Sequence, residues 1–414
     1  MSSIIDLAKK AKNKGLYGSC TAIGSRALKA PHNALTFIRL RRRLQTYGMR
    51  LCETGDINEI RKRTLNYIES MRIKESPYGQ YKYSQSQTEP VLYASLYAAL
   101  TRHLYRDLEE LSDKQREEWI DYIQSHQTDD GLFKDNLIEN EIASTADWWG
   151  WRHLTLHAIM ALAALEATAE KKFKFLEPFK DHRFVIDWLE SRNWRNDPAG
   201  VSNEIQNYTT LLQYARDFQN EEWAGDTVKW ILDWLDENQD PETGLWGNRF
   251  DTPYFLSIGV QTGYHLWLLY FYDKRLIKYT DRIIDSVLKS QNSLGGFGVA
   301  FNSSACEDID SIDPLVRLYF YTDYRREDIK KALQKALPWV LTNMNEDGGF
   351  VFRRFESFKY GHEKMYSRAE ESAMFPTWFR TLSLAYLSKI LTNSVIGKFN
   401  WQFLRCPGMQ FWND

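Results

Sequence analysis

The sequence is short of net charge, of cysteine and of long apolar runs. Its 414 residues contain 53 Lys and Arg against 55 Asp and Glu, a net charge of -2, so no basic face for nucleic acid is expected. The four cysteines, Cys20, Cys52, Cys306 and Cys406, form no Cys-x-x-Cys pair, which argues against a zinc cluster or a disulfide framework. A reducing compartment is the simpler interpretation.

Segments that direct a chain to or across a membrane are also missing. The N-terminal stretch MSSIIDLAKKAKNKG has no apolar run before a cleavage site, and the apolar stretch from Leu154 to Leu165 is too short to span a bilayer. We therefore expect a cytoplasmic protein. The basic segments KKAKNKG, RLRRRLQ and EIRKRTL near the N-terminus indicate either a solvated helical lead-in or a surface that contacts anionic lipid or a partner, so a location peripheral to a membrane stays open.

Aromatic residues, by contrast, are abundant, at 14% of the chain, and several of them recur in one kind of turn. A polar stretch, a Gly and an aromatic residue follow one another in QTDDGLF, QDPETGLW, QNSLGGF and NEDGGF, which end at Phe133, Trp246, Phe297 and Phe350. A weaker copy, SPYGQY, ends at Tyr81, and a degenerate copy, NDPAGVS, lies around Val201. The spacing of about fifty residues is typical of a repeat architecture.

The segments between these turns place apolar residues at i, i+3, i+4 and i+7, which predicts helices. Each interval holds two helices and their connections, so each repeat is one helical hairpin. Six hairpins predict an all-α fold, an (α/α)6 toroid over residues 71–395, whose inner wall is formed by the apolar helix after each turn. Residues 1–70 form a helical N-terminal extension in this interpretation, and residues 396–414 form a tail that packs on the toroid.

Turns with a leading Gln, a Gly and an aromatic residue, as at Gln239, Gln291 and more loosely Gln127, resemble the repeats of the prenyltransferase and squalene-cyclase superfamily. The resemblance covers roughly residues 75–392 and implies the toroid. In the class II terpene cyclases of this superfamily, an Asp-x-Asp-Asp motif stands at the start of an inner helix. The sequence Asp308-Ile309-Asp310-Ser311 is similar to it, with Ser311 in place of the last Asp.

This resemblance implies a class II terpene-cyclase-like enzyme in which Asp310 is the general acid that protonates an isoprenoid alkene, tuned by Asp308 and Asp313. Crowded carboxylates can keep one member protonated, and aromatic faces stabilise a cation in a dry cavity. The aromatic residues expected to face the cation are Trp148, Trp149, Trp151 and Trp378. A structural alternative is that Asp308, Asp310 and Ser311 cap a helix that begins near Pro314.

A second hypothesis comes from polar residues near the expected starts of the inner helices: Arg152, His153, Asn207, Tyr208, His265 and Glu371. Aromatic rings and carboxylates together are typical of sites for sugars, so a carbohydrate-active toroid, a polysaccharide hydrolase, lyase or epimerase, is the alternative. Its acid and base would be drawn from Asp147, Glu204, Asp308, Asp310 and Glu371. Either way we expect a small-molecule or oligomeric substrate in the central cavity, while the oligomeric state stays open.

No metal site is predicted. The zinc-binding pattern of the protein prenyltransferases is not matched, because Cys306 precedes Asp308 and the segment AEESAMFPTWFRTLSLAYL has no His. His153 and His157 share a helical face, but the HExxH signature is missing, so a site with Asp147 is disfavoured. Nucleotide-binding and nucleophile-elbow motifs are missing too. We expect no cofactor, unless the substrate is a diphosphate, which would bring Mg²⁺.

Overall fold

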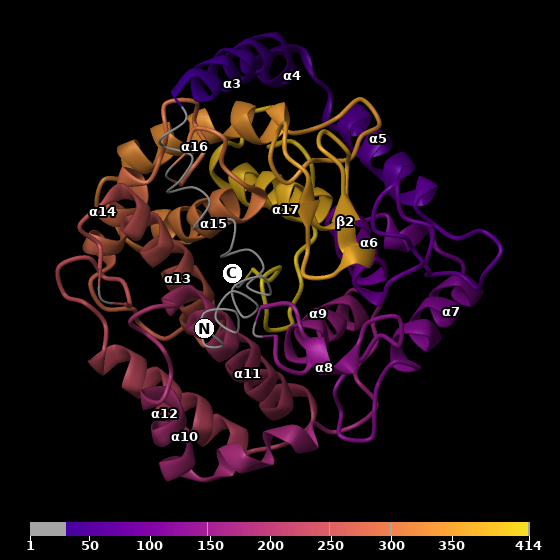
Figure 1. Ribbon diagram of the computed structural model, residues 1–414, viewed down its shortest axis with the longest axis vertical. Helices are drawn as coiled ribbons and strands as arrows, with labels where there is room; N and C mark the ends of the chain where they lie inside the picture. The colour runs from indigo at the N-terminus through magenta and orange to yellow at the C-terminus, as the bar shows by residue number, and fades with distance from the viewer. Residues whose placement is uncertain (1–29, 147, 248, 299, 413–414) are drawn as a thin grey trace, which may run out of the picture.

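The computed structural model describes residues 30–146, 148–247, 249–298 and 300–412, and its described part is mostly helical (Figure 1). Residues 1–29 of the predicted extension and Asp147 lie outside the described residues. The expected all-α class is confirmed. The strands are the two-residue β1 (Phe358–Lys359) and β2 (Tyr366–Ser367), which pair antiparallel between two helices.

Long helices of two kinds alternate along the chain. The first kind is buried over most of its length, and its members are α6 (Leu92–Leu104), α9 (Trp151–Ala164), α11 (Pro198–Phe218), α13 (Pro253–Tyr272), α15 (Ala305–Tyr321) and α17 (Met374–Ile390). The second kind is amphipathic, and its members are α5 (Ile57–Ser70), α7 (Asp113–Gln124), α10 (His182–Glu190), α12 (Trp223–Glu237), α14 (Thr280–Lys289) and α16 (Arg326–Thr342). Short elements lie between these helices: η2 (Leu108–Glu110), α8 (Asn140–Ala143), η3 (Lys174–Lys180) and η4 (Glu363–Met365).

The six buried helices contact one another in chain order. α6 contacts α9, α9 contacts α11, α11 contacts α13, α13 contacts α15, α15 contacts α17, and α17 contacts α6 again. Figure 1 shows these helices toward the middle of the molecule, with α7, α10, α12, α14 and α16 around them. An apolar helix that is buried on all sides needs such neighbours, whereas an amphipathic helix needs only one buried face.

The Gly-aromatic turns fold as the sequence indicates. Their aromatic residues Phe133, Trp246, Phe297 and Phe350 are all buried. Gly295 illustrates the need for glycine: its φ is +98°, and a Cβ there would lie 2.2 Å from the carbonyl oxygen of Lys335. A side chain at this position would strain the backbone and collide with the neighbouring helix α16.

The glutamine that leads three of these turns ties each turn to the next hairpin. In each case its Nε2 donates to the Gly carbonyl of its own turn and to a backbone carbonyl about forty residues downstream. The downstream acceptors of Gln127, Gln239 and Gln291 are Lys171, Lys278 and Ala332, at 2.9, 3.2 and 2.8 Å. The repeated Gln therefore joins consecutive repeats through buried or partly buried hydrogen bonds.

The prediction of a degenerate turn around Val201 is wrong. Asp197 caps α11 by accepting a hydrogen bond from the Gly200 amide (3.2 Å), Pro198 occupies the first helical position, and Val201 lies in the first turn. Asp-Pro is a strong helix-start signal, because Asp accepts from unpaired amides and Pro has no amide to lose. α11 therefore begins before Val201 and carries Asn203 and Glu204 within it.

An N-terminal helix lies over α16 at the edge of the molecule (Figure 1). It consists of α3 (Ala30–Arg43), the π-helical turn η1 (Leu44–Gly48) and α4 (Met49–Thr54). Arg43 donates to the carbonyls of Thr342 (3.0 Å) and Met344 (2.8 Å) at the end of α16. Gly48 allows the close approach, because a Cβ there would lie 2.3 Å from the Pro338 carbonyl oxygen.

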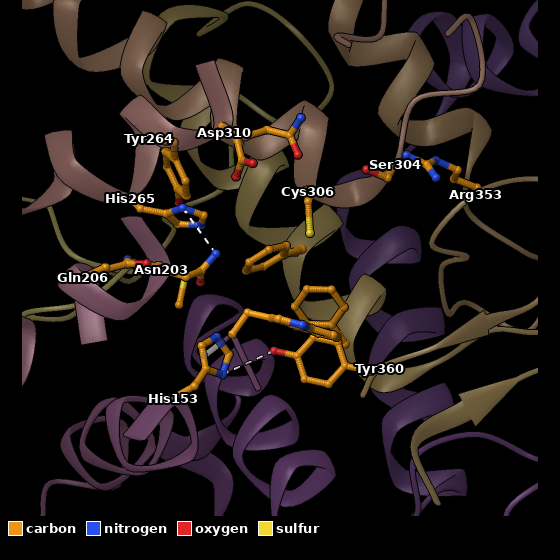
Figure 2. Close-up of a pocket in the computed structure, with 15 residues that line it drawn as sticks. His153, Asn203, Gln206, Tyr264, His265, Ser304, Cys306, Asp310, Arg353 and Tyr360 are labelled. Atoms are coloured by element: carbon orange, nitrogen blue, oxygen red, sulfur yellow. Dashed lines mark hydrogen bonds between the residues drawn. The ribbon is translucent and has the colours of Figure 1, made fainter. Parts of the chain in front are cut away.

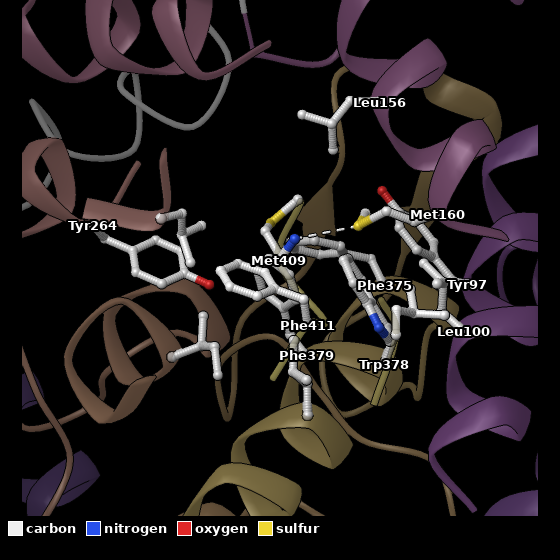
Figure 3. Close-up of a cluster of buried hydrophobic side chains, with 14 of the residues drawn as sticks. Tyr97, Leu100, Leu156, Met160, Tyr264, Phe375, Trp378, Phe379, Met409 and Phe411 are labelled. Atoms are coloured by element: carbon white, nitrogen blue, oxygen red, sulfur yellow. Dashed lines mark hydrogen bonds between the residues drawn. The ribbon is translucent and has the colours of Figure 1, made fainter. Parts of the chain in front are cut away.

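The C-terminal segment inserts among the buried helices rather than lying on their surface. Gln410 donates to the Leu100 carbonyl of α6 (3.1 Å) and accepts from the indole of Trp378 of α17 (2.7 Å). Arg317 of α15 donates to the Phe411 carbonyl (2.8 Å). Figure 3 shows Met409 and Phe411 within the same apolar cluster as Trp378.

Candidate functional site

A cavity lies between the buried helices (Figure 2). Its volume of about 50 Å³ is room for a few water molecules or part of a small ligand. It is lined by Trp148, His153, Asn203, Gln206, Gln261, Tyr264, His265, Ser304, Cys306, Asp310, Arg353, Tyr360, Phe375, Phe379 and Met409. These residues come from α9, α11, α13, α15 and α17, from the turns beside them and from the C-terminal segment, so widely separated parts of the chain meet here.

The lining has an aromatic part and a polar part. Tyr360, Phe375 and Phe379 pack against one another, with Tyr360 and Phe375 centroids 4.4 Å apart and Phe375 and Phe379 centroids 4.4 Å apart. Amide and imidazole side chains from α11 and α13, among them Asn203 and His265, lie on another side of the cavity (Figure 2). The cavity can therefore offer ring faces and hydrogen-bonding groups to the same molecule.

Four of the predicted site residues line the cavity: Trp148, His153, His265 and Asp310. The other nine lie elsewhere: Asp308, Asp313, Trp149, Trp151, Arg152, Asn207, Tyr208, Glu371 and Trp378.

Asp310 is buried, with 3% of its surface exposed, and it lies on the side of α15 that faces the cavity, one turn after Cys306. Burial, together with the negative charges of Glu307, Asp308 and Asp313, raises the pKa of Asp310 well above its ordinary value. The protonated form of this carboxyl group is therefore favoured compared with that of an exposed aspartate. Within the part of the chain that the structure describes, no hydrogen bond reaches this carboxyl and no cationic side chain pairs with it.

The three neighbouring carboxylates each have an arginine. Glu307 pairs with Arg353 at 2.7 Å, Asp308 pairs with Arg380, and Asp313 pairs with Arg317 at 2.6 Å. Four carboxyl groups therefore stand beside three guanidinium groups. The cluster is electrically balanced only while Asp310 keeps its proton.

Asp308 accepts hydrogen bonds from a turn and does not line the cavity. Besides Arg380, its carboxylate accepts from the Phe297 amide (2.9 Å), the Ser303 hydroxyl (2.8 Å) and the Trp339 indole (2.9 Å). Burial raises the pKa of Asp308, an effect that Arg380 and the hydrogen bonds from Phe297 and Ser303 oppose.

Other repeats use a hydroxyl in the place of Asp308. Thr155 of α9 accepts from the amide of Phe133, and Thr377 of α17 accepts from the amide of Phe350, at 2.9 and 3.0 Å. Both aromatic residues belong to Gly-aromatic turns, as Phe297 does. Asp308 thus occupies a position that belongs to the architecture of the repeat.

The alternative that these aspartates cap a helix near Pro314 is wrong. α15 begins at Ala305, and its N-cap is Ser304, whose hydroxyl accepts from the Glu307 amide (3.1 Å) while Glu307 accepts from the Ser304 amide (2.7 Å). This reciprocal pair is a capping box. Asp308 and Asp310 lie inside the helix, where they satisfy no helix terminus.

Asp313 points toward Arg317 and the C-terminal segment. Burial raises the pKa of Asp313 to about 6, although Arg317 opposes the shift. The same Arg317 donates to the hydroxyl of Tyr386 and to the carbonyl of Phe411, both at 2.8 Å. Asp313 therefore orients an arginine that holds the C-terminal segment in place.

The cavity histidines have lowered pKa values. His153 Nδ1 lies 2.9 Å from the Tyr93 hydroxyl and 3.4 Å from the Tyr360 hydroxyl, and His265 Nδ1 lies 3.0 Å from the Ser202 hydroxyl. Burial lowers the pKa of His153 well below its ordinary value and lowers the pKa of His265 to about 3. Burial also raises the pKa of the Cys306 thiol, so this cysteine is not a thiolate.

Metal ligation receives no geometric support from the described residues, since no group of three or more His, Cys, Asp or Glu side chains is placed to hold an ion. The rings of His153 and His157 are tilted by 41° with centroids 4.3 Å apart, and His157 Nδ1 lies 2.8 Å from the His153 carbonyl. Asp147, the third member of the hypothetical site, lies outside the described residues.

Several predicted binding residues are fixed by contacts outside the cavity. Glu371 accepts from the amide (2.6 Å) and hydroxyl (2.9 Å) of Ser86 and from the amide of Arg368 (2.6 Å). Glu204 is held by Arg192 at 2.9 Å.

The predicted aromatic residues that miss the cavity are packing residues. Tyr208 packs on Phe179 and Trp188, with the Arg152 guanidinium 5.4 Å from its ring centre. The Trp149 ring lies against His362, and the Trp151 indole donates to Asn140 at 3.0 Å. Asn207 is fully buried and does not line the cavity.

The sequence interpretation missed Tyr360, Arg353, Tyr264, Gln206 and the Phe375–Phe379 pair. Phe375 and Phe379 share one helical face at i and i+4, a signal that could have suggested a common surface. Tyr360 follows strand β1 in a connection that carries no motif, so nothing in the sequence indicated it.

No helix in the described ranges is long and apolar enough to cross a membrane. No protein-family model and no curated protein sequence matches this chain.

Proposed function

We propose that this protein is a class II terpene-cyclase-like enzyme in which Asp310 protonates an alkene of an isoprenoid substrate, and that its fold is an (α/α)6 toroid of the prenyltransferase and squalene-cyclase type. The cyclic order of contacts among the six buried helices and the repeated Gly-aromatic turns support the toroid. The partial Asp-x-Asp-Asp motif supports the assignment to this superfamily.

The observation that carries the proposal is the buried Asp310 carboxyl group, which lines a cavity, forms no ion pair within the described residues and has a pKa raised well above its ordinary value. An acid that must deliver a proton at neutral pH has to hold that proton beforehand. Burial, together with the negative charges of Glu307, Asp308 and Asp313, favours the protonated form of Asp310. Proton transfer turns Asp310 into a carboxylate, whose negative charge then lies beside the positive charge that alkene protonation creates.

The O–H bond of Asp310 breaks, the electron pair of the alkene forms a new C–H bond, and a carbocation forms beside the Asp310 carboxylate. The acidic cluster then carries one uncompensated negative charge, opposite the cation. The faces of Tyr360 and Phe375 stabilise the cation without adding a nucleophile. Loss of a proton from a neighbouring carbon and return of a proton to Asp310 complete the cycle.

Mg²⁺ does not fit the acidic cluster. Glu307, Asp308 and Asp313 are all held by arginines, and a protonated Asp310 is a poor ligand for a cation. If the substrate carries a diphosphate, Arg353 is a cavity-lining group of the right charge to meet it.

A carbohydrate-active enzyme is the second candidate, since the amides and imidazoles of α11 and α13 are suitable partners for sugar hydroxyls. Glycoside chemistry by two carboxylates needs a second acid or base across the cavity. Glu204 and Glu371 do not supply it, because Arg192 holds the first and Ser86 the second. This weakens the second candidate relative to chemistry that needs one acid.

The test is a product analysis in D₂O. Purified protein is incubated with farnesyl diphosphate, geranylgeranyl diphosphate, squalene or 2,3-oxidosqualene, and extracts are analysed by gas chromatography and mass spectrometry. We expect a cyclised or isomerised product that carries one deuterium from solvent, and we expect Asp310→Asn to lose it. Asp187→Asn, the same isosteric change on the exposed face of α10, should retain it.

Two results would contradict the proposal. One is a product without solvent deuterium, or one formed equally well by Asp310→Asn. The other is a thermal-shift screen in which oligosaccharides raise the Tm and none of the four isoprenoids does, a result that would favour the second candidate.

A further inference from the structure

The outward face of the N-terminal helix presents apolar and cationic side chains together. Leu35, Ile38 and Met49 have 57%, 62% and 43% of their surfaces exposed. Arg42 is exposed on the same face as Leu35 and Ile38, since these three residues are spaced i, i+3 and i+7, and Arg41 is exposed beside it.

The opposite face fixes this helix to the rest of the molecule. Leu40 is fully buried in a small cluster with Leu294 and Trp339. Phe37 packs edge-on against Phe301, with centroids 5.2 Å apart. Together with the hydrogen bonds from Arg43 to the end of α16, these contacts mean that the exposed leucine and isoleucine do not fold back into the protein.

We propose that this face of the helix from Ala30 to Thr54 binds the surface of an anionic phospholipid membrane. No Asp or Glu occurs from Ala30 to Cys52, whereas the whole chain has a net charge of -2, so the positive charge is a local feature of this helix. Phosphate groups of lipids would meet the arginines, and the boundary between headgroups and acyl chains would accept Leu35 and Ile38. The inference is independent of the reaction proposed for the cavity.

Other occupants fit these side chains less well. Nucleic acid would pair with the arginines but would leave Leu35 and Ile38 against water or phosphate. A second copy of this helix would bury the apolar residues but would bring Arg41 and Arg42 of two chains together. An anionic bilayer satisfies both kinds of side chain.

The experiment is flotation of the full chain with vesicles. The probes are vesicles of pure phosphatidylcholine and vesicles with 30 mol% phosphatidylglycerol, each at low and high salt. We expect binding to the anionic vesicles that weakens at high salt. Because each arginine near a membrane surface strengthens binding several-fold, Arg41→Glu/Arg42→Glu should reduce the partition coefficient by about tenfold or more.

Two further variants separate the contributions. Leu35→Ser/Ile38→Ser should also reduce partitioning, about fivefold, since two buried apolar side chains are lost from the lipid boundary. Arg282→Glu/Lys289→Glu is the matched control: it makes the same change in net charge at exposed positions on α14 and should bind as the unchanged protein does. The variants should all unfold at the same temperature as the unchanged protein, because the altered side chains are exposed.

Three results would overturn the proposal. The first is failure of the full chain to float with anionic vesicles. The second is equal partitioning of the Arg41/Arg42 variant and the α14 control, which would place lipid binding elsewhere. The third is dimerisation of the unchanged protein that depends on its concentration, is lost in both helix variants and is not accompanied by binding to vesicles. This result would make the face a contact between two copies of the chain.

Discussion

The guanidinium group of Arg380 on α17 donates to the carboxylate of Asp308 on α15, and both side chains are fully buried. Arg380 also donates to the carbonyls of Ser303 and Phe352, so a single side chain links α17 to the start of α15 and to the turn after α16. This pair joins two helices that the sequence separates by about seventy residues.

Removal of one partner of this pair should be far more costly than removal of both. Asp308→Asn leaves a buried guanidinium without its charge partner, and we expect a loss of about 3–5 kcal/mol in the free energy of unfolding. Asp308→Asn/Arg380→Met should recover part of that loss, because no uncompensated charge stays in the core. Urea denaturation of the two single variants and the double variant measures the coupling. Additive losses would show that the pair is not a unit.

Asp310→Asn should have the opposite effect on stability. The folded-state pKa of Asp310 is raised, so between the unfolded pKa and the folded pKa the folded protein binds more protons than the unfolded chain. Stability then falls as the pH rises through that window. An amide does not ionise in this pH range, so the variant should become more stable relative to the unchanged protein as the pH rises from 4 to 8.

The measurement is the difference in unfolding free energy between Asp310→Asn and the unchanged protein across this pH range. Asp187→Asn on the surface of α10 is the control and should show no pH-dependent difference of comparable size. A difference that shrinks as the pH rises would mean that Asp310 is ionised in the folded protein.

The buried histidines change the stability with pH in the direction opposite to that of Asp310. Burial lowers the pKa of His157 to about 4 and that of His265 to about 3, from ordinary values near 6.5. Below pH 6.5 the unfolded chain binds protons that the folded chain does not, so the stability contributed by these groups is present above pH 6.5 and is lost as the pH falls toward 3–4. NMR of the imidazole protons should show no titration of either ring between pH 8 and 5. A midpoint near 6.5 for His265 would contradict its burial.

The turn glutamines should be equivalent in energy. Gln127, Gln239 and Gln291 each donate to two backbone carbonyls, so replacement by alanine should cost about 1–3 kcal/mol at each position. Gln334→Ala, on the amphipathic helix α16, is a control that should cost less than about 0.5 kcal/mol because surface substitutions usually do. Thermal or urea unfolding of the four variants tests this. A loss confined to one turn would show that the three positions are not equivalent.

Local sequence patterns predicted the helices and most turns, because the helical periodicity of apolar residues and the glycines of turns can both be recognised in the sequence. The prediction at Val201 was wrong because it also relied on a local pattern: NDPAGVS has the Gly of a turn, but its Asp-Pro pair starts a helix. The chain of contacts from α6 round to α17 and back is not visible in any local window, since it depends on how the helices pack.

The site was harder to predict than the helices. Asp310 and Asp308 are two residues apart, yet one lines the cavity and the other is held by Arg380, because helix rotation turns their side chains by about 200°. Glu371 looked like a cavity residue from its position before α17, but Ser86, which lies far away in sequence, holds it in a loop. Tyr360 reaches the cavity from a connection whose course no motif reveals.

The C-terminal segment is synthesised after the helices that it packs against. Met409, Gln410 and Phe411 leave the ribosome after every helix of the described fold, yet they bond to α6, α15 and α17 in its centre. The apolar side chains around Trp378 therefore stay without this cover while the preceding helices assemble. A nascent chain of this protein carries an exposed apolar surface until its last described residues are made, a surface that chaperones can recognise during that interval.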